Sequence, residues 1–163
     1  GEALSNEHLM TLFDAARWAP SAYNEQPWRF TYATAKTEGW NKLNALLGEW
    51  NQQWCANAGA LVLITATKKY QKNDKPNPTF AFDTGAAWMA LALQGASMGL
   101  VVHGMSGFDY EQAAELVELP EDHEVIAMFA VGYPSDKNTL PEDMQEGETP
   151  SGRMDINEFT TQI

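Results

Sequence analysis

The chain has 163 residues, a mass of 18.1 kDa and a formal net charge of −12 at pH 7. Nucleic acids and anionic membrane surfaces are bound through concentrated Lys and Arg, so this charge argues against both as partners. No apolar run reaches the roughly 20 residues that a membrane span requires, and no secretory leader is recognisable. We therefore expect a cytoplasmic protein with no nucleic-acid or membrane partner.

The single cysteine, Cys55, excludes an intramolecular disulfide and a cysteine-cluster metal site, and it agrees with a reducing compartment. The three histidines show no metal-site spacing with Asp or Glu, so we predict no metal. The length predicts one domain over residues 1–163, large enough to bury a substantial core.

The first predicted helix starts after Ser5, a suitable N-cap, and ends before Pro20. Aromatic residues alternate with smaller or polar ones over 28–34, which predicts a strand with one buried face. Apolar residues at helical spacing then predict a helix over 39–50, with Trp50 on its buried face.

The continuous apolar run 60–67 predicts a central strand that is covered on both faces. A polar connector, 68–82, holds four of the seven lysines and predicts a surface loop. The long helix that follows is expected to begin at Asp83 or Thr84 and to end at Gly99. Small residues recur along it, which indicates that another backbone approaches closely.

The remaining sequence predicts a strand and loop over 100–108, then a short helix capped by Asp109, and then a strand over 124–134. A polar tail follows. Alternating helices and strands predict a central sheet with helices on its faces. No glycine-rich phosphate loop follows the first strand, so a dinucleotide-binding doubly wound fold is not expected.

The corner between the first helix and the first strand concentrates polar side chains. Pro20 and Pro27 fix the chain at its two ends, and Ser21, Asn24 and Gln26 lie between them. Such an edge suits a flat heterocycle with alternating donors and acceptors. The same side chains also commonly cap turns, and spacing alone leaves both interpretations open.

Four segments, in order, resemble the nitroreductase family. They are APSAYNEQPWRF, CANAGALVLITAT, DTGAAWMALALQGASMGLVVHGMSGFD and VIAMFAVGYPSD, and together they cover most of residues 5–136. The resemblance implies an α+β, nitroreductase-like fold over 1–163, with a central, mainly antiparallel sheet flanked by helices. It also implies an intertwined homodimer with one FMN in each of two interface sites, the extension 136–163 packing on the partner subunit.

Carried over by position, the resemblance assigns eleven residues to FMN binding and leaves the catalysis to the cofactor, with no catalytic side chain. The corner would contact the flavin that is bound mainly by the other subunit. Residues 104–107 would lie along the N5 and O4 edge of the flavin ring. Arg153 would bind the FMN phosphate. His103 borders this loop and is either a ring donor or a packed strand histidine. The assigned residues are Pro20, Ser21, Ala22, Asn24, Gln26, Asn51, Gly104, Met105, Ser106, Gly107 and Arg153.

The implied activity is hydride transfer from NAD(P)H through flavin N5 to a nitroaromatic, quinone or similar small-molecule acceptor, by a ping-pong mechanism. Two alternatives stay open: a non-catalytic or cofactor-poor dimeric flavin-binding module of the same fold, and a flavin enzyme with one dedicated metabolite. Family members usually start with an Arg-x-Ser segment that contacts the phosphate and the ring, whereas this chain starts GEALSNEH. Without compensation by Arg153 or lysines, we expect FMN binding to be weaker by about 1.5–3 kcal/mol.

Overall fold

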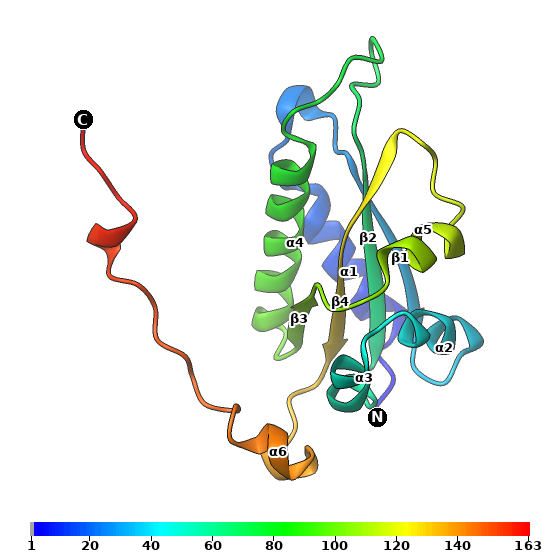
Figure 1. The fold of residues 1–163 in the computed structure, drawn as a ribbon, viewed down its shortest axis with the longest axis vertical. Coiled ribbons are helices and arrows are strands. Elements are labelled where there is room, and N and C mark those ends of the chain that lie inside the picture. Colours follow the sequence, from blue (N-terminus) through cyan, green and yellow to red (C-terminus); the bar gives the residue numbers. More distant parts are fainter. Residues whose placement is uncertain (1) are drawn as a thin grey trace.

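Four antiparallel strands form the centre of the structure, a computed structural model that describes residues 2–163 (Figure 1). Within these residues the strands lie in the order β1-β2-β4-β3, so that β2 and β4 are interior and β1 and β3 are edges. Their bounds are β1 Trp28–Thr34, β2 Ala60–Thr67, β3 Val101–Met105 and β4 His123–Gly132. The expected central, mainly antiparallel sheet is confirmed.

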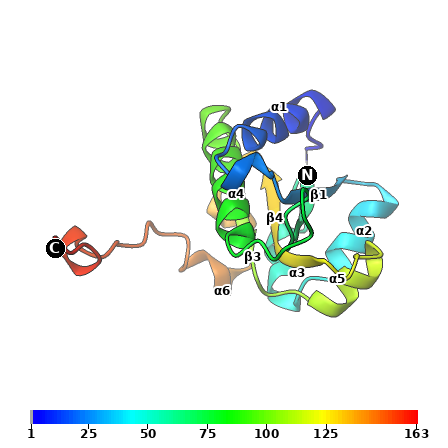
Figure 2. The same ribbon diagram turned by 90° about the horizontal axis from the view of Figure 1, so that it is seen from above.

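Helices cover both faces of this sheet. The α-helices are α1 Asn6–Arg17, α2 Glu38–Ala45, α3 Glu49–Cys55, α4 Phe80–Ser97, α5 Tyr110–Leu116 and α6 Glu142–Gln145. Three short 3₁₀ turns are η1 Ala22–Asn24, η2 Lys137–Thr139 and η3 Ile156–Glu158. Figure 2 shows α1 and α4 on one side of the sheet and α2, α3 and α5 on the other.

The alternation of side chains along β2 divides the core into two layers. Val62 and Ile64 are buried in the cluster that includes α1 and α4. Leu61 and Leu63 are buried in the cluster that includes α2, α3 and α5. Because successive side chains of a strand point to opposite faces, a fully buried β2 requires helices on both sides, as the apolar run 60–67 predicts.

The first helix and strand have their predicted bounds. The Ser5 hydroxyl accepts a hydrogen bond from the His8 backbone N–H at 3.1 Å, which caps α1. In β1 the expected buried face is confirmed only in part. Trp28 is buried and Phe30 packs on the core, whereas Tyr32 is exposed near the end of this edge strand.

The single helix expected over 39–50 is wrong. The structure has two helices, α2 and α3, and Gly48 precedes the second with extended backbone angles. This break resets the helical phase, so Trp50 leaves the buried face on which the pattern places it and is 56% exposed. The consequence for function is large, because the start of α3 borders the cavity described below.

The predicted start of α4 is also wrong. The helix begins at Phe80, one turn earlier, and both Asp83 and Thr84 are buried inside it. The predicted end is confirmed: Gly99 has a φ of +72°, and the Leu100 N–H donates to the Gly95 carbonyl at 2.9 Å. That bond belongs to the Schellman arrangement, which favours glycine at this position.

The later elements follow the predicted order, with Asp109 capping α5 through a 2.9 Å bond from the Gln112 N–H. Figure 1 shows the C-terminal tail leaving the body of the molecule after α6. All residues from 146 to 163 are exposed. Among residues 2–163, no helix combines the length and apolar character needed to cross a membrane.

Candidate functional site

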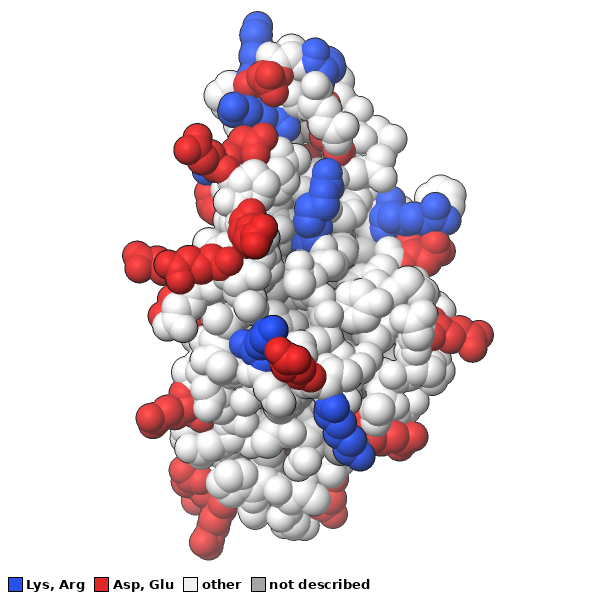
Figure 3. Space-filling model, turned by 90° about the vertical axis from the view of Figure 1, so that its right-hand side faces the viewer, with Lys and Arg blue, Asp and Glu red and all other residues white. Residues whose placement is uncertain are grey.

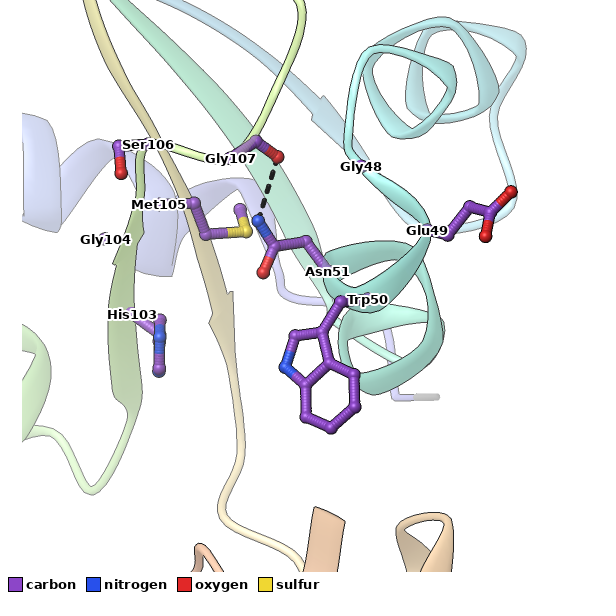
Figure 4. A pocket seen from close by; sticks show the side chains of 9 residues that line it. All are labelled: Gly48, Glu49, Trp50, Asn51, His103, Gly104, Met105, Ser106 and Gly107. Atoms are coloured by element: carbon purple, nitrogen blue, oxygen red, sulfur yellow. Dashed lines mark hydrogen bonds between the residues drawn. The ribbon is translucent and has the colours of Figure 1, made fainter. Parts of the chain in front are cut away.

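A cavity of about 510 Å³ lies between the start of α3 and the loop that joins β3 to α5 (Figure 4). Most of the residues around it are exposed, so it is open to solvent. They are Gly48, Glu49, Trp50, Asn51, His103, Gly104, Met105, Ser106 and Gly107. The cavity therefore includes all five residues that the sequence assigns to this region, Asn51 and 104–107.

Asn51 connects the two sides of the cavity. Its Nδ2 donates to the Gly107 carbonyl at 2.9 Å, and its Oδ1 accepts from the Trp54 indole N–H at 3.0 Å. The Gly107 carbonyl also accepts from the Gly48 backbone N–H at 3.0 Å. Asn51 thus holds the β3–α5 loop against α3 and fixes the shape of the cavity wall.

Two of the lining glycines are closely approached by other side chains. A Cβ on Gly107 would lie 2.9 Å from Asn51 Nδ2, and a Cβ on Gly104 would lie 3.1 Å from the Trp88 ring. The absence of a side chain at Gly107 therefore leaves room for the Asn51 amide, and its absence at Gly104 leaves room for the Trp88 ring. In both cases the backbone, not a side chain, borders the cavity.

The β3–α5 loop offers unused hydrogen-bond donors. Within residues 2–163 the backbone N–H groups of Ser106 and Gly107 donate to no protein acceptor. Unpaired backbone donors need water or a ligand as partner. Two such groups at the edge of an open cavity can bind electronegative ring atoms or an anion.

Aromatic rings flank the opening. The His103 ring packs on the Trp54 ring, with centroids 4.4 Å apart and an interplanar angle of 46°. His103 remains exposed, because β3 is an edge strand, so it is not a fully packed strand histidine. Figure 4 shows Trp50 and His103 on opposite sides of the space below Asn51. Glu49 is the acidic residue of the lining.

At the Pro20–Trp28 corner, much of the polar capacity is used internally. The Ser21 hydroxyl accepts from the Gln26 backbone N–H at 3.0 Å, and Gln26 Nε2 donates to the Asn24 carbonyl at 3.1 Å. The turn-capping interpretation therefore holds for Ser21 and Gln26. The Asn24 side chain is exposed and makes no hydrogen bond with the described part of the chain.

The corner is anchored to two distant segments. Asp83, inside α4, accepts from the Ala22 N–H at 3.0 Å. The buried Glu25 carboxylate accepts from the Gln71 N–H at 2.9 Å, and Gln71 Nε2 donates to the Glu25 carbonyl at 3.3 Å. These anchors hold a backbone with positive φ angles at three non-glycine residues, Tyr23, Asn24 and Gln26.

The structure thus places the assigned residues in three regions of one chain. The corner residues lie beside the first turns of α4, and Asn51 with 104–107 forms the cavity wall. Arg153 lies in the exposed tail, where its guanidinium donates to the Ser151 and Gly152 carbonyls. Neither the corner nor Arg153 lines the cavity of its own chain.

Sequence reasoning missed Gly48, Glu49 and Trp50 as lining residues. The available signal was Gly48 itself, a helix-breaking residue that interrupts the apolar pattern two positions before Trp50. Cys55 follows on the same helix but is buried, and burial raises the pKa of its thiol to about 11. Its thiol is therefore neutral and unreactive near neutral pH.

Comparisons with known proteins agree on one family. The family model described as "Nitroreductase family" matches residues 1–133. A protein of Archaeoglobus fulgidus, named "Putative NADH dehydrogenase/NAD(P)H nitroreductase", is 28% identical over 143 residues, covering 85% of this chain and 79% of the other. A solved structure described as "the oxidoreductase containing FMN" is 39% identical, with a TM-score of 0.94, and the match covers 99% of this chain and 83% of that one.

A more distant structure supports the fold alone. It is that of a "putative nitroreductase in complex with FMN" from Exiguobacterium sibiricum, which is 21% identical. Its TM-score is 0.80, and the match covers 100% of this chain and 89% of that one. The helices and the antiparallel sheet described above are therefore an α+β arrangement shared across relatives of low identity.

Proposed function

The chain belongs to the nitroreductase family, and on this premise we propose that it is an FMN-dependent oxidoreductase. It oxidises NAD(P)H and reduces nitroaromatic, quinone or similar acceptors by a ping-pong mechanism. The observation that carries the proposal is the open cavity beside the β3–α5 loop, with two unused backbone donors on Ser106 and Gly107. The FMN in the name of the 39% identical relative and the NAD(P)H in the name of the Archaeoglobus protein support it.

The residues present fit the ring system of FMN. Gly104, Ser106 and Gly107 are exposed, so a flat ligand can approach their backbone closely. The free N–H groups of Ser106 and Gly107 suit the electronegative edge of the ring. FMN, when bound, supplies the redox chemistry by accepting hydride at N5 and passing the electrons on. The chain's own contribution is to orient the ring, and the exposed rings of His103 and Trp50 border the space left for a second flat molecule.

We further propose a homodimer in which the corner of one subunit completes the site of the other. The outer face of α4 exposes apolar side chains, with Phe82 80% and Leu93 59% exposed, beside the small residues Gly85 and Ala92. The tail exposes four more apolar side chains, those of Met154, Ile156, Phe159 and Ile163. Two apolar surfaces without cover in the described residues favour mutual burial between copies.

The dimer also gives Arg153 a role that it lacks within its own subunit. It is one of three arginines in the chain, and the others, Arg17 and Arg29, are bonded to Asp14 and to the carbonyls of Gln26 and Trp28. A tail packed on the partner would bring Arg153 to the FMN phosphate. Light scattering tests the assembly: a mass of about twice 18.1 kDa supports it, and a monomer contradicts the shared site.

Rapid mixing tests the activity. Protein loaded with FMN is mixed anaerobically with NADH or NADPH, and the flavin absorbance is followed, then restored with a nitroaromatic or quinone. Bleaching by either dinucleotide and recovery with the acceptor are expected. Retained FMN that neither dinucleotide bleaches would instead indicate the non-catalytic flavin-binding module.

A further inference from the structure

Lysines are concentrated on one loop of the structure. Residues 68–75, called the lysine loop below, contain Lys68, Lys69, Lys72 and Lys75, four of the seven lysines of a chain with a net charge of −12. Figure 3 shows basic side chains at the upper end of the molecule, the end at which Figure 1 places this connector. Acidic side chains are spread along the length of the same face.

These lysines are available to a ligand. None of the four forms a salt bridge with another described residue. Lys68 and Lys69 share a hollow with Glu121 and Asp122, which offsets part of their charge. Lys72 and Lys75 are exposed and lie outside that hollow.

The lysine loop is fastened to the corner at several points. Gln71 makes the two hydrogen bonds to Glu25 described above. The Tyr70 and Tyr23 rings meet edge to face with centroids 5.8 Å apart, and the Lys72 ammonium lies 4.0 Å from the centre of the Tyr23 ring. The loop therefore moves with the corner, and Lys72 is held beside an exposed aromatic face.

We propose that the lysine loop, with Tyr23, binds the phosphate-bearing half of the dinucleotide that reduces the flavin. The inference rests on the proposed function, because it places the corner at the partner's flavin and so places the lysine loop at the rim of that site. A phosphorylated adenine nucleotide offers both anionic groups for ammonium groups and a flat ring for an exposed tyrosine. In a strongly acidic protein, a local positive loop also attracts a polyanion that the remaining surface repels.

The experiment compares three FMN-loaded proteins in the reductive half-reaction. They are the wild type, the double variant Lys72→Gln/Lys75→Gln and a control, Lys36→Gln, whose exposed lysine lies in the turn after β1. In the double variant the dissociation constant of NADH should rise about tenfold, and that of NADPH should rise by more than that. The limiting rate of flavin bleaching should be unchanged. The control should match the wild type.

Calorimetric titration of the FMN-free proteins with adenosine 2′,5′-bisphosphate provides a readout without turnover. Binding that is weakened in the double variant and retained in the control supports the proposal. Dissociation constants within twofold of wild type for both dinucleotides overturn it. The proposal is also overturned if the double variant has a raised KM for the anionic acceptor nitrobenzoate, but not for neutral nitrobenzene, while dinucleotide binding is unchanged. That result would assign the lysine loop to binding of the acceptor.

Failure of the proposed function gives a different result. Wild-type protein that no dinucleotide bleaches contradicts the reductase activity itself. The titration then decides the present inference: selective loss of bisphosphate binding in the double variant supports a phosphate site, and no binding by the wild type refutes it.

Discussion

The corner and the β3–α5 loop differ in where their hydrogen-bonding groups point. The corner is rich in polar side chains, yet Ser21 and Gln26 bond within it and Glu25 and Asp83 anchor it. The β3–α5 loop has few polar side chains but leaves backbone donors free. The polar side chains of the corner thus mainly stabilise its own backbone, whereas the glycine-containing β3–α5 loop has hydrogen-bond donors available for a ligand.

This difference separates stability from binding. Substitutions at the anchors of the corner should mainly lower the free energy of unfolding and affect flavin binding only indirectly. Changes at the cavity wall or at the free Asn24 side chain should weaken flavin binding with little loss of stability.

The largest effect is expected for Asp83→Ala. Removal of the carboxylate leaves the Ala22 N–H without its acceptor beside a buried position, whereas the Thr79 hydroxyl keeps Asn77 Oδ1 as an acceptor at 2.9 Å. The free energy of unfolding, measured by urea denaturation, should fall by about 2–4 kcal/mol. The exposed Asp14→Ala is the matched control and should cost less than about 1 kcal/mol. Equal losses in the two variants would show that the corner needs no such anchor.

Asn51→Ala should separate the two properties at the cavity wall. It removes the bonds to the Gly107 carbonyl and from the Trp54 indole, both at a partly exposed position. Stability should fall by about 1 kcal/mol, while the FMN dissociation constant rises about tenfold, as the loop loses its fixed position. The neighbouring, exposed Gln53→Ala should change neither. An Asn51 variant with unaltered FMN affinity would remove this wall from the site.

Asn24→Ala is the smaller test at the corner. Its side chain is exposed and unbonded in the described structure, but its φ of +60° disfavours alanine, so stability should fall by about 1 kcal/mol through the backbone alone. FMN should nevertheless dissociate a few times faster if the corner of one subunit borders the flavin of the other. Fluorescence recovery on flavin release measures this rate. An unchanged rate would make the whole corner a structural turn.

Cys55 should have no effect near neutral pH and should give a pH dependence of stability only in alkaline solution. Burial raises the pKa of its thiol to about 11, above its value in the unfolded chain. The unfolded state therefore loses this proton first, and stability is lost as the pH rises from about 9 toward 11. Urea denaturation across this range should show a shallower decline for Cys55→Ala than for wild type. Parallel curves would contradict a buried neutral thiol.

Local signals predicted much of the fold. Ser5 and Asp109 cap helices with their own side chains, Gly99 ends α4 with a positive φ, and the eight apolar residues of β2 require cover on both faces. Each of these features depends on residues a few positions apart. The family resemblance also predicted the arrangement of the sheet.

Interactions across long stretches of chain account for what was missed. Asp83 looks like a helix cap because its acceptor role toward Ala22, 61 residues away, leaves no local trace. Trp50 looks like a core residue until the break at Gly48 turns it toward the cavity. The use of the corner's polar groups likewise depends on Gln71, 46 residues from Glu25, which no spacing rule contains.

The central claim is that the cavity between α3 and the β3–α5 loop holds FMN. It is tested most directly by the visible absorption spectrum of the purified protein, taken after FMN is added and the sample is desalted. Wild-type protein should retain the flavin bands. Gly107→Ala, whose Cβ would lie 2.9 Å from Asn51 Nδ2, should lose most of them while still unfolding cooperatively. A colourless wild type, or equal retention by a folded Gly107→Ala variant, would contradict the site.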